Sequence, residues 1–293
     1  MTYDTSKEKL IKVNGVELAT ETFGNSDDPA VLLIQGAGNS MISWGDGFCQ
    51  KIVDGGRYVI RYDTRDTGRS TNYEVGKPGY TLRDLEADAV ALLDAFSIQK
   101  AHVVGLSQGA GIGQLLAIEH PDRLLSVTLI SGTPGGPGHR AADLPGMTDE
   151  IGKVFAGQAG PAEPDWSDRD SVANYLMENE RAFAGSGNFD AEWFRANGGD
   201  VFDRTTNLAA QMTNPFLIEV GNPWRDKLDN ITIPTLVIHG ANDPLFPIEH
   251  GEAMAKEIPG AKLVKIEGMG HAQVAPAVWG RIVSAILDHT KVS

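Results

Sequence analysis

The sequence predicts an α/β fold: a mainly parallel sheet covered by helices on both faces, with a helical insertion in the second half of the chain. Short patterns that are apolar throughout alternate with amphipathic helical patterns, as expected for strands buried under helices on both sides. An Asn-Gly turn near the start predicts an antiparallel hairpin at one edge. Residues 134–228 carry several helical patterns and no convincing strand.

Eight strands are expected in all. The first two, residues 10–13 and 16–23, flank Asn14-Gly15, where both turn positions need a positive φ. The third, residues 30–35, ends in the glycine-spaced loop Gly36-Ala37-Gly38. The others are expected at residues 58–62, 101–106, 124–131, 235–239 and 262–266.

The clearest helix is expected after Thr81. Thr81 and Asp84 have the spacing of an N-cap with an acidic residue in the first turn, and apolar residues recur at helical spacing up to Phe96. Further helices are expected at residues 46–54, 109–120, 248–258 and 277–290. Their alternation with the strands supports the layered arrangement.

Residues 134–228 interrupt this alternation. Helical patterns are expected there at residues 171–184, 191–196 and 206–212. Long connections in compact domains usually serve as lids. The expected division is therefore a core of residues 1–133 and 229–293, with a helical cap of residues 134–228 inserted after the sixth strand.

Composition excludes several classes of protein. The 293 residues include 25 Lys+Arg and 39 Asp+Glu, a formal charge of −14, which disfavours binding to nucleic acid or to a membrane surface. The single cysteine, Cys49, allows neither an intrachain disulfide nor a cysteine-based zinc site. The start of the sequence is polar and without a signal-peptide pattern, so a cytoplasmic location is expected. No metal or cofactor is expected, and homo-oligomerisation is left open.

The strongest chemical signal is Gly105-Leu106-Ser107-Gln108-Gly109, at the junction of an expected strand and an expected helix. A sharp strand-to-helix turn with glycines at both flanks exposes the serine oxygen at the edge of the sheet. We therefore expect Ser107 to be a nucleophile. A serine hydroxyl needs a neighbouring base to take its proton.

His271 is the expected base. It follows Gly268-Met269-Gly270 directly after the last expected strand, in a loop that returns over the sheet edge. The other six histidines fall in strands, in helices or at the entrance to the cap, and they are interpreted as structural or as unsuited to the role: His102, His120, His139, His239, His250 and His289.

Asp243 is the expected partner of His271. It follows the strand at residues 235–239, so it lies at the same edge of a parallel sheet, and the order Ser, Asp, His along the chain suits such a sheet. Asp63 and Asp66 are rivals, but they precede the serine. They are interpreted as ion-pair partners that fix their own loop, together with Arg61, Arg65 and Arg69.

Acyl transfer also needs donors for a developing oxyanion. The amide of Gln108, at the start of its helix, is one candidate. The amide of Ala37 is the other, because the flanking Gly36 and Gly38 permit close approach to a ligand. Trp44, a few residues further on, is expected to reach the substrate.

Together these motifs resemble the α/β-hydrolase superfamily of serine esterases over nearly the whole chain. A narrower similarity is to the aclacinomycin methylesterase group, which hydrolyses a methyl ester on an anthracycline. Gln35 departs from the histidine that many superfamily members have before the glycine loop. The residues that carry the narrower similarity are Gly38-Asn39, Trp44, Arg61-Tyr62-Asp63 and the run from Arg65 to Thr71.

The resemblance implies an esterase with a helical cap and no cofactor. We therefore expect a small-molecule ester substrate, such as the methyl ester of a bulky polyketide-like compound. A cofactor-free haloperoxidase or perhydrolase, a carbon–carbon bond hydrolase and a non-catalytic ligand receptor stay open as alternatives. The cap aromatics are expected to form the cap's own core more than a pocket wall: Trp166, Tyr175, Phe183, Trp193, Phe194, Phe202, Phe216 and Trp224.

Overall fold

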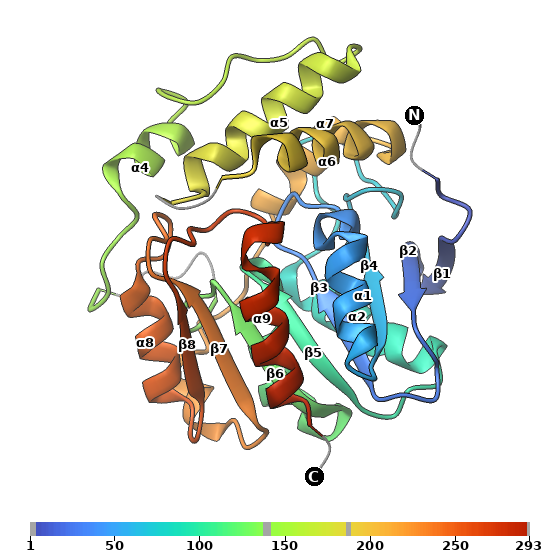
Figure 1. Cartoon of the computed structure of the whole chain (residues 1–293), viewed down its shortest axis with the longest axis vertical. Helices are drawn as coiled ribbons and strands as arrows, with labels where there is room; N and C mark the ends of the chain where they lie inside the picture. The colour runs from blue at the N-terminus through green and yellow to red at the C-terminus, as the bar shows by residue number, and fades with distance from the viewer. Residues whose placement is uncertain (1–3, 137–141, 186–188, 292–293) are drawn as a thin grey trace.

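The computed structural model describes residues 4–136, 142–185 and 189–291. Within these ranges the strands are β1 (Lys9–Val13), β2 (Val16–Phe23), β3 (Ala30–Ile34), β4 (Tyr58–Tyr62), β5 (Ala101–Leu106), β6 (Leu124–Ile130), β7 (Thr235–Gly240) and β8 (Lys262–Ile266). They form one eight-stranded sheet in the order β1-β2-β4-β3-β5-β6-β7-β8 (Figure 1). The pairs β1–β2 and β2–β4 are antiparallel, and the other neighbours are parallel.

The N-terminal hairpin forms at the predicted turn. Asn14 and Gly15 have φ values of 48° and 79°, the left-handed pair that a two-residue hairpin turn requires. Val13 therefore pairs with Val16, and this turn sets the register of the whole hairpin. The predicted mainly parallel sheet with an antiparallel N-terminal edge is confirmed.

Helices cover both faces of the sheet. One face packs on α1 (Asp46–Asp54) and α9 (Pro276–His289), and the other on α2 (Leu82–Ala95), α3 (Gln108–Glu119) and α8 (Ile248–Glu257). Successive residues of β3 point to opposite faces of the sheet. Leu32 packs in the core cluster with α2, α3 and α8, whereas Leu33 packs in the cluster with α1 and α9, and both are fully buried. Because both sides are covered, the central strands are apolar throughout.

The start of α2 is fixed by local chemistry. The Thr81 side chain accepts the Asp84 N–H, and the Asp84 carboxylate accepts the Thr81 N–H, a complete capping box. The apolar face that follows packs on the sheet through Leu82, Leu85 and Leu92. Short 3-10 turns connect other elements, at Met41–Trp44, Pro121–Arg123, Asn214–Phe216 and Arg225–Asn230.

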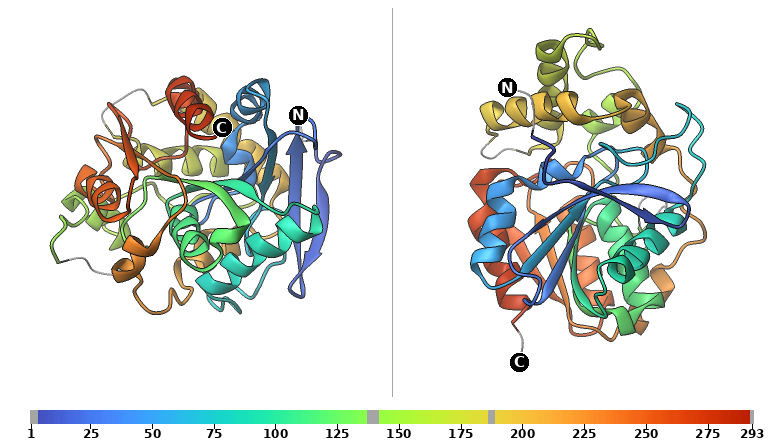
Figure 2. Two further views of the ribbon diagram at one scale, coloured as in Figure 1. Left: turned by 90° about the horizontal axis from the view of Figure 1, so that it is seen from below. Right: turned by 90° about the vertical axis from the view of Figure 1, so that its right-hand side faces the viewer.

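The segment between β6 and β7 is helical where the structure describes it. It contains α4 (Asp149–Phe155), α5 (Arg169–Phe183), α6 (Ala191–Arg204) and α7 (Leu208–Thr213), which lie together above the sheet (Figures 1 and 2). The boundaries expected for the cap stay a prediction. Trp224, on the cap side of the expected boundary at 228, packs in the core cluster with α2, α3 and α8.

Helix α6 is longer than expected. The helix was expected to end at residue 196, before Gly198 and Gly199, and a glycine inside a helix costs about 1 kcal/mol relative to alanine. Instead, the helix continues to Arg204. A Cβ at Gly198 would lie 3.1 Å from the carbonyl oxygen of Ala173 on α5, so glycine here serves the close packing of two cap helices. Helix α4 has no counterpart among the predicted elements.

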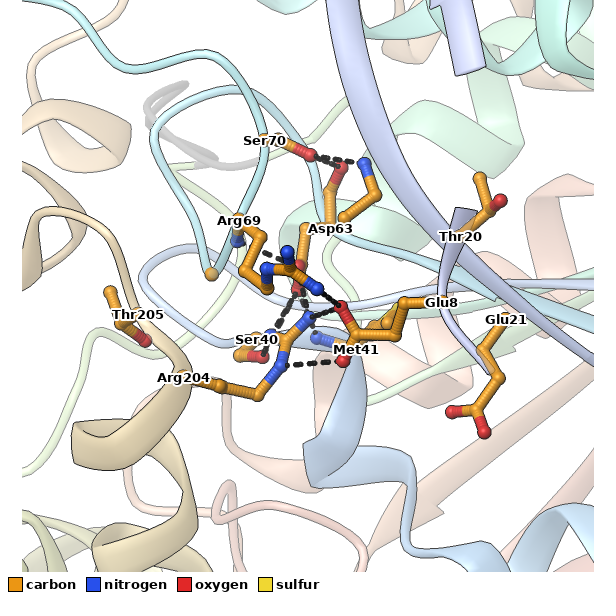
Figure 3. A network of polar contacts seen from close by, with 12 residues as sticks. Glu8, Thr20, Glu21, Ser40, Met41, Asp63, Arg69, Ser70, Arg204 and Thr205 are labelled. Carbon is orange, nitrogen blue, oxygen red and sulfur yellow. Dashed lines mark hydrogen bonds and ion pairs between the residues drawn. The ribbon is translucent and has the colours of Figure 1, made fainter. Parts of the chain in front are cut away.

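A buried ion-pair cluster joins the cap to the core (Figure 3). We call it the cap anchor: Arg204 at the end of α6, Asp63 directly after β4, and Glu8 before β1. The Arg204 guanidinium lies 2.7 Å from Asp63 Oδ2 and 3.0 Å from Glu8 Oε2. Asp63 Oδ1 also accepts hydrogen bonds from Ser40 Oγ and from the Met41 amide. Segments that are distant in sequence are therefore held beside the loop that follows β3.

Asp63 and Asp66 do not form the ion pairs that were expected with Arg61, Arg65 and Arg69. Asp63 pairs with Arg204, and Asp66 accepts hydrogen bonds from the Tyr73 amide and the Asn214 side chain. The three neighbouring arginines pair elsewhere: Arg61 with Glu21 and Asp46, Arg65 with Asp88, and Arg69 with Glu8. Nearness in sequence did not identify partners that tertiary packing brings together.

Candidate active site

Ser107 occupies a strained turn between β5 and α3, with φ 53° and ψ −110°. Positive φ costs a non-glycine residue about 1–3 kcal/mol. A Cβ at Gly105 would lie 2.1 Å from the carbonyl oxygen of Gly109, and a Cβ at Gly109 would lie 2.3 Å from that of Ile34. Neither position has room for a side chain, so the glycine spacing follows from close backbone packing around the turn.

Ser107, His271 and Asp243 come from three loops at one edge of the sheet and form a continuous hydrogen-bonded line. His271 Nε2 lies 2.9 Å from Ser107 Oγ, and its Nδ1 lies 2.8 Å from Asp243 Oδ2. In the tautomer protonated at Nδ1, the imidazole donates to Asp243 and accepts from the serine hydroxyl. The structure thus brings the three predicted residues together in the order needed for proton transfer.

Asp243 is buried and well supplied with donors. Its Oδ1 accepts the amides of Leu245 and Phe246 at 2.9 and 2.8 Å. Burial acts to raise the pKa of the Asp243 carboxyl, but His271, His239 and the Phe246 amide outweigh it and hold that pKa below its usual range. The carboxylate therefore stays charged beside the imidazole, where it can orient the ring and balance an imidazolium.

The loop after β3 lies beside Ser107, because a Cβ at Gly36 would approach Ser107 Cβ to 3.3 Å. The amides of Ala37 and Gln108 donate to no group in the described part of the chain. Gln108 also opens α3, where unpaired N–H groups and the helix dipole favour negative charge. Two donors are thus available close to Ser107. The Gln35 side chain bends back onto this loop and accepts the Gly36 amide at 3.0 Å.

A cavity of about 240 Å³ lies between the cap and this edge of the sheet, and Ser107 and His271 form part of its wall. Gly36, Ala37 and Gly38 line it as well. Phe183, Phe194 and Phe216 line it from the cap side, so the interpretation of the aromatics as cap core holds only in part. Of the other cap aromatics, Trp166 packs edge-on against Tyr175, and Trp224 is buried in the core cluster with α2, α3 and α8.

Trp44 does not reach the cavity, contrary to expectation. Its side chain is fully buried and stacks on Phe48, with ring centroids 5.3 Å apart. It belongs to the core cluster on the α1–α9 face of the sheet. Trp44 ends the short 3-10 turn at Met41–Trp44, and its large ring points inward. Burial removes the apolar surface of the ring from solvent, which stabilises the fold.

Three of the other histidines are engaged in structural hydrogen bonds. His102 Nδ1 lies 2.8 Å from Ser126 Oγ, and His239 Nε2 lies 2.7 Å from the carbonyl oxygen of Phe246. His250 Nδ1 lies 2.8 Å from Thr133 Oγ1. These contacts agree with their interpretation as structural. His139 lies outside the described residues.

Sequence reasoning missed six polar residues of the cavity wall: Asn39, Asn179, Glu180, Asn197, Gln211 and Gln273. Glu180 lies on α5, where a single charge in a helical pattern is typical of a solvated face. Gln273 lies two residues after His271, and Asn39 directly follows the glycine loop. The positions of Gln273 and Asn39 beside these two motifs are the one sequence signal that could have indicated either residue.

The strained serine turn and the sheet order together define an α/β hydrolase. The chain belongs to this family, since the family model described as alpha/beta hydrolase fold matches residues 29–275. More particularly, the chain is 34% identical to rhodomycin D methylesterase DnrP of Streptomyces peucetius, over 97% of this chain and 98% of the relative. It is 33% identical to rhodomycin D methylesterase DauP of Streptomyces sp. strain C5, again over 97% and 98%.

Solved structures support the same fold. A hydrolase from Pseudomonas aeruginosa PA01 superposes with a TM-score of 0.72 at 26% identity, covering 99% of this chain and all of that one. The enol-lactonase from Burkholderia xenovorans LB400 superposes with a TM-score of 0.71 at 23% identity, covering 96% and 99%. Because the identity to the enol-lactonase is only 23%, this similarity shows a shared fold and nothing about function.

Of the helices formed by the described residues, none has the length and apolar character needed to cross a membrane. Nor do these residues place three or more histidine, cysteine, aspartate or glutamate side chains in a group that could hold a metal ion.

Proposed function

We propose that this protein is a serine-dependent carboxylic ester hydrolase that cleaves the methyl ester of a bulky, mainly apolar small molecule through an acyl-enzyme. The observation that carries the proposal is the hydrogen-bonded line from Ser107 through His271 to Asp243 in the wall of an apolar cavity. The two methylesterase relatives support methanol as the leaving alcohol.

In the first half of the reaction, Ser107 Oγ attacks the ester carbonyl carbon while His271 Nε2 takes the serine proton. Asp243 holds the ring and balances the imidazolium. The carbonyl oxygen becomes an oxyanion that accepts hydrogen bonds from the Ala37 and Gln108 amides, each worth about 3 kcal/mol in such sites. The intermediate collapses as His271 gives its proton to the leaving methanol oxygen, and the acyl group stays on Ser107.

In the second half, water replaces methanol. His271 Nε2 takes a proton from the water as its oxygen attacks the acyl carbon, and the same two amides receive the second oxyanion. Collapse returns the proton to Ser107 Oγ and releases the carboxylic acid. The cap aromatics Phe183 and Phe216 provide the apolar surface on which a bulky acyl group packs.

The experiment compares the wild type with Ser107→Ala on two substrates: p-nitrophenyl acetate, followed by absorbance, and rhodomycin D, followed by mass spectrometry for conversion of the methyl ester to the acid. We expect the variant to lose at least about 1000-fold in kcat/KM on both. A fluorophosphonate probe should label the wild type at Ser107.

Ser167→Ala is the matched control, because Ser167 is an exposed serine of the cap that does not line the cavity. It should keep the wild-type rates. Retained hydrolysis by a folded Ser107→Ala variant would refute the nucleophile. Hydrolysis of p-nitrophenyl acetate without any turnover of bulky methyl esters would refute the substrate class.

A further inference from the structure

A polar patch forms one part of the cavity wall, which also contains the polar residues Asn179, Asn197 and Gln211. It consists of Asn39 from the loop after β3, Glu180 from α5 and Gln273 from the loop after β8, and we call these residues the acceptor patch. None of the three has a task in the hydrolysis proposed above. Polar groups inside an apolar cavity are costly unless they have partners, so their presence calls for a ligand group or a structural role.

Gln273 connects the other two members. Its amide donates to Glu180 Oε2 at 2.9 Å, and its side-chain Nε2 donates to Glu180 Oε1 at 3.0 Å and to Asn39 Oδ1 at 2.8 Å. Both Nε2 hydrogens are thereby used, which fixes the orientation of the side-chain amide. Gln273 Oε1 is buried and has no hydrogen-bond partner in the described ranges. Within the patch, one buried acceptor, Gln273 Oε1, is therefore left without a donor.

The patch also lacks a positive charge. Across the described part of the chain, Glu180 is the one acidic residue in the cavity wall, and neither lysine nor arginine lines it. Burial raises the pKa of the Glu180 carboxyl, even though the bonds from Gln273 and the nearby His271 act to lower it. A cation placed against this carboxylate would offset the cost of its burial.

The patch is close to the reacting atoms. Glu180 and Phe183 are three residues apart on α5, hence on the same side of that helix. The Phe183 carbonyl oxygen accepts the His271 amide at 2.6 Å and the Ala272 amide at 3.2 Å. Glu180 is thus held one helical turn from the loop that carries His271. A group bound at the patch can therefore belong to the same molecule as an ester at Ser107.

We propose that the acceptor patch binds a protonated amine of the ester substrate and selects against esters that carry a carboxylate. An ammonium group brings one positive charge, which the patch lacks, together with three N–H donors. A substrate carboxylate would instead meet Glu180 with no cation between them. This inference rests on the proposed function, because it assigns a substrate class to the same cavity.

The first test uses the wild-type protein. The p-nitrophenyl esters of heptanoic acid, of 6-aminohexanoic acid and of adipic acid (as the half ester) have neutral, cationic and anionic tails of similar length. We expect kcat/KM at pH 7 to be at least about tenfold higher for the amino ester than for the half ester, as for a charge pair in a partly desolvated site. Equal values would overturn the proposal.

The second test uses Glu180→Gln, with Glu178→Gln as the matched control. Glu178 lies on the same helix, pairs with Arg181 and does not line the cavity, so its replacement removes the same formal charge without touching the patch. We expect Glu180→Gln to lower the ratio of amino ester to half ester about tenfold while the neutral ester changes less than about threefold. Glu178→Gln should keep the wild-type ratio.

The remaining outcomes separate this proposal from the one on which it rests. If Glu180→Gln slows all three esters equally, or if both glutamine variants shift the ratio alike, the patch merely joins the cap to the core and the proposal is wrong. If the wild type hydrolyses none of the esters, the proposed function fails instead. Calorimetric titration with hexylammonium and hexanoate then decides: tighter binding of the amine supports the patch, and equal binding overturns it.

Discussion

Arg204 of the cap anchor provides a direct test of how the cap is held. Its side chain is fully buried, and those of its partners Glu8 and Asp63 are 2% and 0% exposed. Replacing it by methionine keeps an unbranched apolar stem but leaves two carboxylates buried without their guanidinium. Removing one partner of a buried ion pair costs about 3–5 kcal/mol.

The surrounding contacts indicate the lower end of that range. Asp63 keeps hydrogen bonds from Ser40, Met41 and the Arg69 amide, and Glu8 keeps the Arg69 side chain. We therefore expect Arg204→Met to lose about 3 kcal/mol of unfolding free energy. For a chain of this size each kcal/mol shifts the melting temperature by about 2–4 °C, so the melting temperature should fall by about 6–12 °C.

Unfolding in urea and on heating, followed by circular dichroism, measures both quantities. Arg181→Met is the control, because Arg181 is 48% exposed and pairs with the 42% exposed Glu178, and such surface pairs contribute about 0–1 kcal/mol. Arg204→Lys keeps the charge but not the planar fork, and should lie between Arg204→Met and the wild type. An unfolding free energy for Arg204→Met within about 1 kcal/mol of the wild type would refute the reasoning.

Three further predictions concern the site and the core. Asp243→Asn should lower kcat about 10⁴-fold with little change in melting temperature, because the imidazole loses its orienting carboxylate; a loss below about tenfold in steady-state kinetics would contradict the assigned role. Gly109→Ala should abolish esterase activity, since its Cβ would collide with the Ile34 carbonyl, whereas Gly280→Ala, in α9 with nothing within 4 Å of a new Cβ, should keep it. Burial lowers the pKa of His102 from 6.5 to about 4, so between these pH values the unfolded chain binds a proton that the folded protein does not. The stability contributed by neutral His102 is therefore complete above pH 6.5 and is lost as the pH falls toward 4. That contribution is at most about 3 kcal/mol, and urea titrations between pH 7 and 4 should show a weaker pH dependence for His102→Gln than for the wild type.

Elements with a local cause were predicted well from the sequence. The Asn14-Gly15 turn needs only its own two residues, and the start of α2 needs only Thr81 and Asp84. The elbow around Ser107 is local only in part: a Cβ at Gly105 would collide with the Gly109 carbonyl within the turn, whereas a Cβ at Gly109 would collide with the carbonyl of Ile34 on β3. At the hairpin turn and at the start of α2, the neighbouring sequence contains the whole physical reason for the structure.

Features that depend on distant contacts were predicted poorly. Helix α6 passes through Gly198 because α5 packs against it, and Asp63 finds its guanidinium 141 positions away in Arg204. Trp44 turns inward because Phe48 and the sheet offer it an apolar site. Glu180 joins the candidate site only because α5 crosses the cavity. Apart from Phe48, which follows Trp44 by four residues, the partners in these cases lie outside any short window of the sequence.

The hydrogen bond from the His271 amide to the Phe183 carbonyl restricts how the cap can move and how it can be exchanged. Phe183 ends α5, so its carbonyl has no acceptor role inside that helix and is available to the histidine loop. A cap that swung away as one rigid hinged body would pull on the loop that positions the imidazole. Substrate is therefore expected to enter past side chains at the rim. A chimaeric enzyme with a foreign cap would need a helix that ends at this same place to keep its histidine in register.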